Sequence, residues 1–248
     1  MSLPKVVSRD QWVTARKALL AKEKDLTRRR DAINTERRML PMVKIDKDYG
    51  FEGPQGKVGL LDMFEGRRQL IIRHFMFDPG WDDGCPSCTA GADEFSEGLM
   101  RHLHARDTSL AVVSRAPLAK IEGYKTKRGW TFPWFSSFGS DFNYDFHVTL
   151  DESVAPIEYN YRTKAEFEER GEAGFLVPGE SSEQPGQSCF LRVDDGVFHT
   201  YSSFARGAEG TGGSYYFLDE TALGRQQEWE EPKGRADGAR GAVPDFAS

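Results

Sequence analysis

The sequence predicts an α/β protein with a central mixed sheet flanked by helices. Segments of strand and helix character follow one another as strand, helix, strand, helix and strand, which is the pattern of parallel βαβ units. Two further strands surround Asp195-Gly196, a strong signal for a hairpin turn. An antiparallel hairpin should therefore complete the sheet, and a long helical arm should precede it.

Residues 1–45 are expected to form this basic helical arm. Ser8 and Gln11 fit a capping box at its start, and Pro41 supplies a stop. Apolar residues recur along it every seven positions: Trp12, Leu19, Leu26, Ile33 and Leu40. The positions halfway between them are mostly charged, so a full coiled-coil seam is absent. This narrow apolar stripe predicts a helix that lies across a surface, either on its own domain or on the partner in a homodimer.

Residues 46–222 are expected to form the main domain. After a polar, glycine-rich connection at 46–59, the expected elements are a strand at 69–77, a helix from 85 to about 106, a buried strand at 109–114, a helix at 118–128, an extended aromatic segment at 131–137, an irregular or edge segment at 142–148, a strand pair at 188–202 and a short strand or helix entry at 215–218. The polar stretch 151–187 predicts an insertion with a short helix at 165–170. Residues 223–248 are expected to form a charged, glycine-rich tail.

The composition argues against several classes of protein. The 248 residues carry a net charge of −6 at pH 7, which argues against a dedicated nucleic-acid binder. The arm itself is basic, which is typical of a solvated helix face, and contact of Arg28-Arg29-Arg30 with RNA or phosphate stays open. No apolar run approaches the roughly 18 residues of a membrane span, and Met1–Asp10 does not resemble a secretory signal. With only three cysteines, a reducing, cytoplasmic setting is expected.

The CPSC motif, Cys85-Pro86-Ser87-Cys88, is the one sharp chemical signal. A CxxC pair that follows a strand and opens a helix is the arrangement of thiol–disulfide chemistry. Cys85 would lie at the helix N-cap, where backbone N–H groups and the positive end of the helix dipole favour a thiolate. Pro86 suits the first helical position. Because Cys88 lies one turn on, Cys85 is the candidate nucleophile and Cys88 the candidate resolving thiol.

The residues just before the motif are candidate supporting residues. Asp82 and Asp83 would oppose a thiolate if they point toward it, and they would leave it unaffected if they face solvent. They could also relay protons to Cys88. Trp81 either shields the disulfide, contacts the substrate or is an ordinary loop aromatic.

Two other interpretations of the cysteines stay open. A metal site normally needs four ligands, and Cys85, Cys88 and Cys189 with one histidine could supply them, although a second CxxC pair is absent. Alternatively, the pair is buried and inert. The glycines form neither a phosphate-binding loop nor a dinucleotide fingerprint, so no cofactor is expected.

Three segments give the chain a family resemblance. FMFDPGWDDGCPSC (75–88), RGWTFPWFSS (128–137) and GRQQEWEEPKGR (224–235) resemble a thioredoxin-like family of predicted dithiol–disulfide oxidoreductases of unknown physiological function, and the likeness runs from about residue 5 to 240. The resemblance implies a thioredoxin-like fold and a redox role for the CPSC motif. The resemblance does not imply a known substrate. For a dithiol oxidoreductase we expect electrons from a thiol donor, no cofactor, and a protein or small-molecule thiol or disulfide as the substrate.

The sequence departs from better-known relatives of this fold. Pro86-Ser87 is more similar to the glutaredoxin dipeptide than to the Gly-Pro of thioredoxin. Thioredoxin-like proteins usually have a cis-proline before the hairpin, facing the nucleophile. Here that point falls near Ser188 and Cys189, with Pro185 about three residues early. In that arrangement Cys189 lies close to Cys85 as a third redox thiol or metal ligand; otherwise it is a small apolar residue of the strand core.

Two alternatives to a dithiol oxidoreductase follow from the sequence. SRAPLAKIEGYKTKRGWTFPWFSS (114–137) looks like a peroxiredoxin segment. Peroxiredoxins, however, place a threonine and a proline before the reactive cysteine where this chain has Asp82 and Asp78, so the peroxide-activating hydroxyl is missing. A binding or assembly protein that kept a redox fold is the second alternative, motivated by the arm, the insertion and the aromatic run from Trp130 to Phe146.

Overall fold

The computed structural model describes residues 3–177 and 179–211, together with residues 213, 218, 220, 221, 228 and 233. Most of the segment expected at 215–218 and of the tail expected at 223–248 therefore lies outside the described residues. The chain divides into two compact units, the first containing Met1–Pro41 and the second Met42–Ser214. The two units are described separately.

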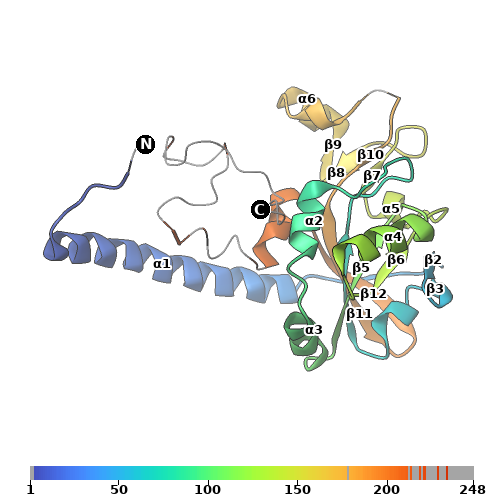
Figure 1. The fold of residues 1–248 in the computed structure, drawn as a ribbon, viewed down its shortest axis with the longest axis horizontal. Coiled ribbons are helices and arrows are strands. Elements are labelled where there is room, and N and C mark those ends of the chain that lie inside the picture. Colours follow the sequence, from blue (N-terminus) through green and yellow to red (C-terminus); the bar gives the residue numbers. More distant parts are fainter. Residues whose placement is uncertain are drawn as a thin grey trace. The chain divides into compact units, whose positions relative to one another are not determined.

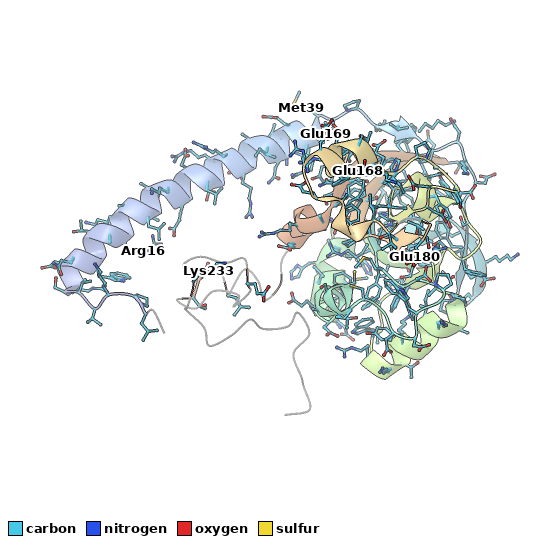
Figure 2. The ribbon with its side chains drawn as sticks, turned by 90° about the horizontal axis from the view of Figure 1, so that it is seen from above. Arg16, Met39, Glu168, Glu169, Glu180 and Lys233 are labelled. Atoms are coloured by element: carbon cyan, nitrogen blue, oxygen red, sulfur yellow. The ribbon has the colours of Figure 1, made fainter. Side chains whose placement is uncertain are left out.

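The first unit contains one long helix, α1 (Arg9–Arg38), shown in blue in Figure 1. Ser8 is its N-cap: the Ser8 hydroxyl accepts from the N–H of Gln11, and the Gln11 side chain accepts from the N–H of Ser8. The predicted capping box is thus confirmed. Figure 2 shows the side chains of α1 as sticks. The apolar residues that recur every seven positions are exposed, from 48% for Trp12 to 67% for Leu26. The surface on which this stripe packs stays a prediction.

The second unit is built on one sheet, in which eight strands of the described residues lie in the order β1-β12-β11-β4-β5-β6-β2-β3. At its centre, β4 (Gln69–His74), β5 (Thr108–Ser114) and β6 (Trp134–Ser136) run parallel. The hairpin of β11 (Gly186–Val193) and β12 (Gly196–Phe204) is antiparallel to β4. The outer strands are β1 (Val43–Lys44), β2 (Gly50–Gly53) and β3 (Gly56–Gly59). The predicted mixed sheet with an antiparallel hairpin is confirmed.

The strands from β12 to β5 have the thioredoxin-like arrangement. β4 and β5 are parallel neighbours joined by a crossover that contains α2 (Pro86–Ala92) and α3 (Glu97–His104), both labelled in Figure 1. In the strand order, the β11–β12 hairpin lies on the other side of β4. Helix α4 (Leu118–Arg128) joins β5 to β6, and Gly129 ends it with a left-handed φ of 69°. The predicted fold class, a thioredoxin-like mixed sheet flanked by helices and preceded by a long helix, is therefore confirmed.

The two faces of the sheet carry separate apolar clusters. Leu70 and Ile72 of β4 belong to the first cluster, which also contains Phe142 and Phe190. The second cluster includes residues of β5, β6, α2, α4 and the loop that follows β4: Phe75, Phe77, Cys88, Ala92, Val112, Ile121 and Trp134. Because successive side chains of a strand point to opposite faces, β5 serves both clusters and is buried along its whole length.

Three predicted elements differ from the structure. The helix predicted from 85 to about 106 is two helices, because the hydroxyl of Ser96 caps a second helix start. The connection predicted at 46–59 contains the β2–β3 hairpin. The segment at 142–148 begins with a short helix, α5 (Phe142–Asp145), rather than edge structure. Phe142 and Phe146 are one helical turn apart, and their rings pack with centroids 4.5 Å apart in the first cluster.

The remaining elements are short and lie mostly between α5 and β11: η1 (Asp62–Phe64), β7 (Thr149–Leu150), β8 (Glu158–Tyr159), β9 (Arg162–Thr163), α6 (Lys164–Glu169), η2 (Ala173–Phe175), β10 (Ser182–Glu183) and η3 (Ala205–Thr211). The helix expected at 165–170 is confirmed as α6, and Figure 2 labels its Glu168 and Glu169. β10 pairs with β7, so two antiparallel strands bring together the chain at residues 149–150 and 182–183, near the two ends of the predicted insertion. Among the described residues, no helix is both long and apolar enough to span a membrane.

Candidate active site

The CPSC motif lies at the start of α2, just beyond the end of β4. Cys85 is the N-cap and Pro86 occupies the first turn, as the sequence predicts. The N–H of Cys85 donates to the carbonyl of Met76 at 3.0 Å, which ties the motif to the chain that leaves the sheet. Cys85 is half-buried, Cys88 is only 9% exposed, and both thiols are free. The pair therefore has one accessible and one enclosed sulfur.

Cys85 is the more acidic of the two thiols. A hydrogen bond from the Cys88 side chain lowers the pKa of Cys85 to about 6, and burial partly opposes this effect. The backbone N–H groups of Ser87 and Cys88, in the first turn of α2, lower this pKa further. Near neutral pH, Cys85 is therefore largely a thiolate.

Cys88 behaves in the opposite way. Its pKa is raised well above the ordinary value because it shares its proton with Cys85, because it is buried, and because the Cys85 charge is close. The backbone N–H of Met76 and the guanidinium of Arg73 act in the other direction. The pair thus separates into an acidic thiol at the surface and a protonated thiol behind it.

Two lysines of α4 hold the loop before the motif. The ammonium group of Lys120 donates to the carbonyls of Pro79 at 2.8 Å and Trp81 at 2.7 Å. Lys127 pairs with Asp83 at 2.8 Å on the exposed surface. The loop that leads to Cys85 is therefore held by side chains of α4.

The two carboxylates before the motif do not oppose the thiolate. Asp83 is directed to Lys127, Asp82 is exposed, and neither is among the main groups that shift the pKa of Cys85. Of the options that the sequence leaves open, this geometry favours solvent-facing carboxylates. Trp81 is 40% exposed, and its role beside the motif stays a prediction.

Arg115 forms a network that the sequence did not indicate. Its guanidinium pairs with Asp78 in the loop before the motif and donates to Glu183 of β10 at 2.7 Å, where the carboxylate is buried. It also donates to the hydroxyls of Tyr144 and Ser181, each at 3.2 Å. The acidic partners lie 37 and 68 residues away in the sequence, so no local pattern could reveal them.

Aromatic side chains pack against the start of α2 and fix its position. A Cβ atom on Gly84 would lie 2.5 Å from the ring of Phe75, so only glycine fits here without a shift of that ring. Phe75 in turn packs against Trp134, with ring centroids 4.6 Å apart. The Thr89 hydroxyl bonds the carbonyl of Cys85 and the hydroxyl of Tyr124, both at 2.9 Å. The backbone around Cys85 is thus held by the ring of Phe75 and by the hydrogen bonds of Thr89.

Ser188 lies on the other face of the sheet. It pairs with Ile72, which belongs to the apolar cluster opposite that of Cys88. Its hydroxyl bonds His74 Nε2 and the Ser202 hydroxyl, each at 2.8 Å, and Ser202 bonds His199 Nε2 at 2.7 Å. The Ser188 side chain is therefore part of a histidine–serine hydrogen-bond chain and does not face Cys85.

Pro185 directly precedes β11, which begins at Gly186 opposite His74. The expectation that Ser188-Cys189 takes the position before this strand is wrong, because the pairing of β11 begins two residues before the apolar run that indicated the strand. Pro185 therefore lies at the sheet end where β4 leads toward the CPSC motif. Its carbonyl accepts a hydrogen bond from the Tyr159 hydroxyl at 3.0 Å.

The metal alternative is not supported. Across residues 3–177, 179–211 and the isolated described positions, no group of three or more His, Cys, Asp or Glu side chains could hold a metal ion. Cys85, Cys88 and Cys189 therefore do not form the proposed ligand set. Cys189 is half-buried in β11 opposite Ile71, within the strand rather than at its end, and its role as a third redox thiol stays a prediction.

The sheet order and the polarised cysteine pair define a class: a thioredoxin-fold protein with a CxxC motif at a helix start. A comparison with protein families matches residues 1–239 to the family described as a bacterial protein of unknown function, DUF899, and the chain belongs to this family. The extent of the match agrees with the resemblance seen in the sequence. A comparison with curated proteins found no match.

Solved structures provide more distant similarities. The chain is similar to the bacterioferritin comigratory protein of Xanthomonas campestris, described as reducing alkyl peroxides, with 14% identity and a TM-score of 0.41 over 65% of this chain and 83% of that chain. It is also similar to the peroxidoxin BcpB of Mycobacterium tuberculosis, with 12% identity and a TM-score of 0.41 over 69% of this chain and 92% of that chain. Because both scores are below 0.5, the fold assignment depends on the strand order of the chain itself.

Proposed function

We propose that this protein is a dithiol thiol–disulfide oxidoreductase, with Cys85 as the nucleophile and Cys88 as the resolving thiol. One observation supports this function above all: a half-exposed thiol at a helix N-cap receives a hydrogen bond from a buried thiol one turn on. That arrangement lowers the pKa of the accessible Cys85 thiol, and it places the Cys88 thiol where it can attack in the second step.

The reaction proceeds through a mixed disulfide. The Cys85 thiolate attacks one sulfur of a substrate disulfide, forms a Cys85–substrate bond and releases the other substrate sulfur as a thiolate. Cys88 then attacks Cys85, which forms the Cys85–Cys88 disulfide and releases the second substrate thiol. The substrate gains two electrons and the protein loses two. A thiol donor reverses these steps to reduce the protein, so electrons need no further cofactor.

The substrate class is a protein or small-molecule disulfide in a cytoplasmic setting. Two features around Cys85 support an open substrate position: Trp81 is exposed beside the motif, and Cys85 itself is half-buried rather than enclosed. The substrate would approach along the loop that Lys120 braces.

Graded glutathione redox buffers test this function. After equilibration, free thiols are trapped by alkylation and the protein is analysed by mass spectrometry. We expect a reversible two-proton mass change in the peptide that contains Cys85 and Cys88, with an unchanged result for Cys189→Ser. Cys88→Ser should instead accumulate a glutathione adduct on Cys85. If both cysteines are alkylated in every buffer, the protein is not a dithiol oxidoreductase, and the binding or assembly alternative is favoured.

A further inference from the structure

Arg73 is a partly buried cation on the same face of the sheet as α2. It stands in β4 beside Val112 of β5, and Val112 packs in the same apolar cluster as Cys88. Paired residues of neighbouring strands point to the same face, so Arg73 points toward α2. Its Nη1 donates to the carbonyl of Ala208 at 3.0 Å, and its Nη2 lies 3.6 Å from the point that a Cβ on Gly91 would occupy. The guanidinium therefore lies between the sheet, η3 and α2.

This position brings the charge of Arg73 to Cys88. Gly91 lies in α2 three residues beyond Cys88, so the guanidinium lies under the helical turn that carries the resolving thiol. The interaction is mutual: Arg73 lowers the pKa of Cys88, and Cys88 raises the pKa of Arg73 against the effect of burial. An arginine keeps its charge near neutral pH, so it acts on Cys88 as a fixed cation.

Other titratable groups lie near Arg73 and Cys88. Cys85 accepts the hydrogen bond of Cys88. Tyr159 is near enough to sense the Cys88 charge, and its pKa is raised to about 12, mainly by burial, so it is neutral. Glu209 raises the pKa of Arg73 and pairs with Arg206 at 3.5 Å. Among the described groups with the largest effects on the Cys88 pKa, Arg73 is the cation.

We propose that Arg73 is a positioning residue for the resolving step: its guanidinium charge holds Cys88 as a thiolate while Cys88 attacks the mixed disulfide on Cys85. This inference rests on the proposed dithiol function. Once Cys85 is bonded to the substrate, it carries no negative charge and accepts no proton from Cys88. Two of the effects that keep Cys88 protonated are then gone, and the third, which is burial, is opposed by the backbone N–H of Met76 and by the charge of Arg73.

The step balances without a new reactant. Cys88 first loses its proton to solvent, because Arg73, being already charged, cannot take it. The Cys88 thiolate forms a bond to the Cys85 sulfur, and the bond between Cys85 and the substrate sulfur breaks. The substrate sulfur leaves with the electron pair and takes up a proton from solvent. The two cysteines are oxidised by two electrons, and the substrate disulfide is reduced to two thiols.

A two-phase reaction with 5,5′-dithiobis(2-nitrobenzoate) tests this inference. In a Cys189→Ser background, attack by Cys85 releases a first chromophoric thiolate, and resolution by Cys88 releases a second. We expect Arg73→Met to slow the second phase by about tenfold at pH 7, as a one-unit rise of the Cys88 pKa requires, with the first phase much less affected. The difference should shrink at higher pH, and Arg73→Lys should recover most of the rate. Arg128→Met is the matched control, since Arg128 is already paired with Asp93 at the end of α2.

The outcomes separate this inference from the proposed function. If the parent protein shows no second phase, the dithiol function fails. If both phases are present and a folded Arg73→Met has an unchanged second phase, the role of Arg73 is contradicted. If Arg73→Met does not fold, the pH profile of the parent decides. An apparent pKa of the second phase at or below the free thiol's roughly 8.5 supports the inference, and one above about 10 overturns it.

Discussion

The two faces of the central sheet handle buried titratable groups in opposite ways. On one face, His74 and His199 are joined through Ser188 and Ser202, and burial lowers the pKa of both histidines. On the other face, two thiols share one proton near the partly buried Arg73, and the outer thiol is half-exposed.

The difference shows where chemistry can occur. The histidine–serine chain keeps its groups neutral and bonded to hydroxyls; its His74 and Ser188 are buried, so no substrate reaches them. The cysteine pair keeps an accessible charge, and the groups that stabilise it come from a helix start rather than from a counter-ion. We therefore infer that the first face contributes stability, and the proposed redox function assigns reactivity to the second.

The largest expected effect separates the faces directly. Cys85→Ser should abolish the rapid first phase of thiolate release, because it removes the acidic nucleophile. His74→Gln should keep that phase within about twofold while lowering the free energy of unfolding by about 1–3 kcal/mol, the cost of a lost buried hydrogen bond. Stopped-flow absorbance and urea denaturation measure the two quantities. A loss of the first phase in folded His74→Gln would show that the faces are coupled.

A second variant tests the anchor of the reactive loop. Arg115→Met leaves the buried Glu183 without its cation, which should cost about 3–5 kcal/mol of stability at pH 7. Adding Glu183→Gln should restore part of this loss, because a neutral amide needs no counter-ion. Urea denaturation of both variants measures this. Equal stabilities of the parent and Arg115→Met would mean that the network does not hold the loop.

Gly84 offers a smaller, local test of the face that carries the dithiol. Gly84→Ala places a Cβ against Phe75 and should lower the free energy of unfolding by about 1–3 kcal/mol. Gly123→Ala is the matched control, since its Cβ would meet nothing within 4 Å inside α4; it should raise stability by up to about 1 kcal/mol. Thermal unfolding compares them. Tolerance of Gly84→Ala would contradict the tight packing under Cys85.

The smallest effect is a pH dependence on the histidine face. The pKa of His74 is lowered to about 3, mainly by burial, whereas an unfolded histidine titrates near roughly 6.5. Between these values the unfolded state binds more protons, so stability is lost as the pH falls through this window. His74→Gln should therefore show a shallower loss of stability between pH 6.5 and 5 in urea denaturation. Identical slopes would mean that His74 is not held neutral.

The strongest local signals predicted the fold well. The CPSC motif and the Ser8 capping box depend on neighbouring residues, and each lies where the sequence indicated. The predicted hairpin is also present, but its turn is Asp194-Asp195, and Gly196 is the first residue of β12. The helix predicted through Ser96 was too long because apolar spacing continued past a cap. The start of β11 was misplaced because Gly186 and Gln187 carry no strand signal, although they pair with β4.

The missing parts of the site depend on contacts between distant segments. Arg115 meets Glu183 and Asp78 only after the sheet has formed, and Arg73 reaches α2 only because β4 lies beneath that helix. Neither arginine stands in a motif of its own. Their roles follow from strand register and burial, which one sequence does not display.

The proposed redox function depends on the acidity of Cys85, which a titration measures. In a Cys189→Ser background, the rate of alkylation of Cys85 by iodoacetamide is measured from pH 4 to 10. We expect a midpoint near 6, and a clear rise toward the free thiol's roughly 8.5 in Cys88→Ala, which removes the shared proton. A midpoint near 8.5 in both proteins would contradict the shared proton and the redox function that depends on it.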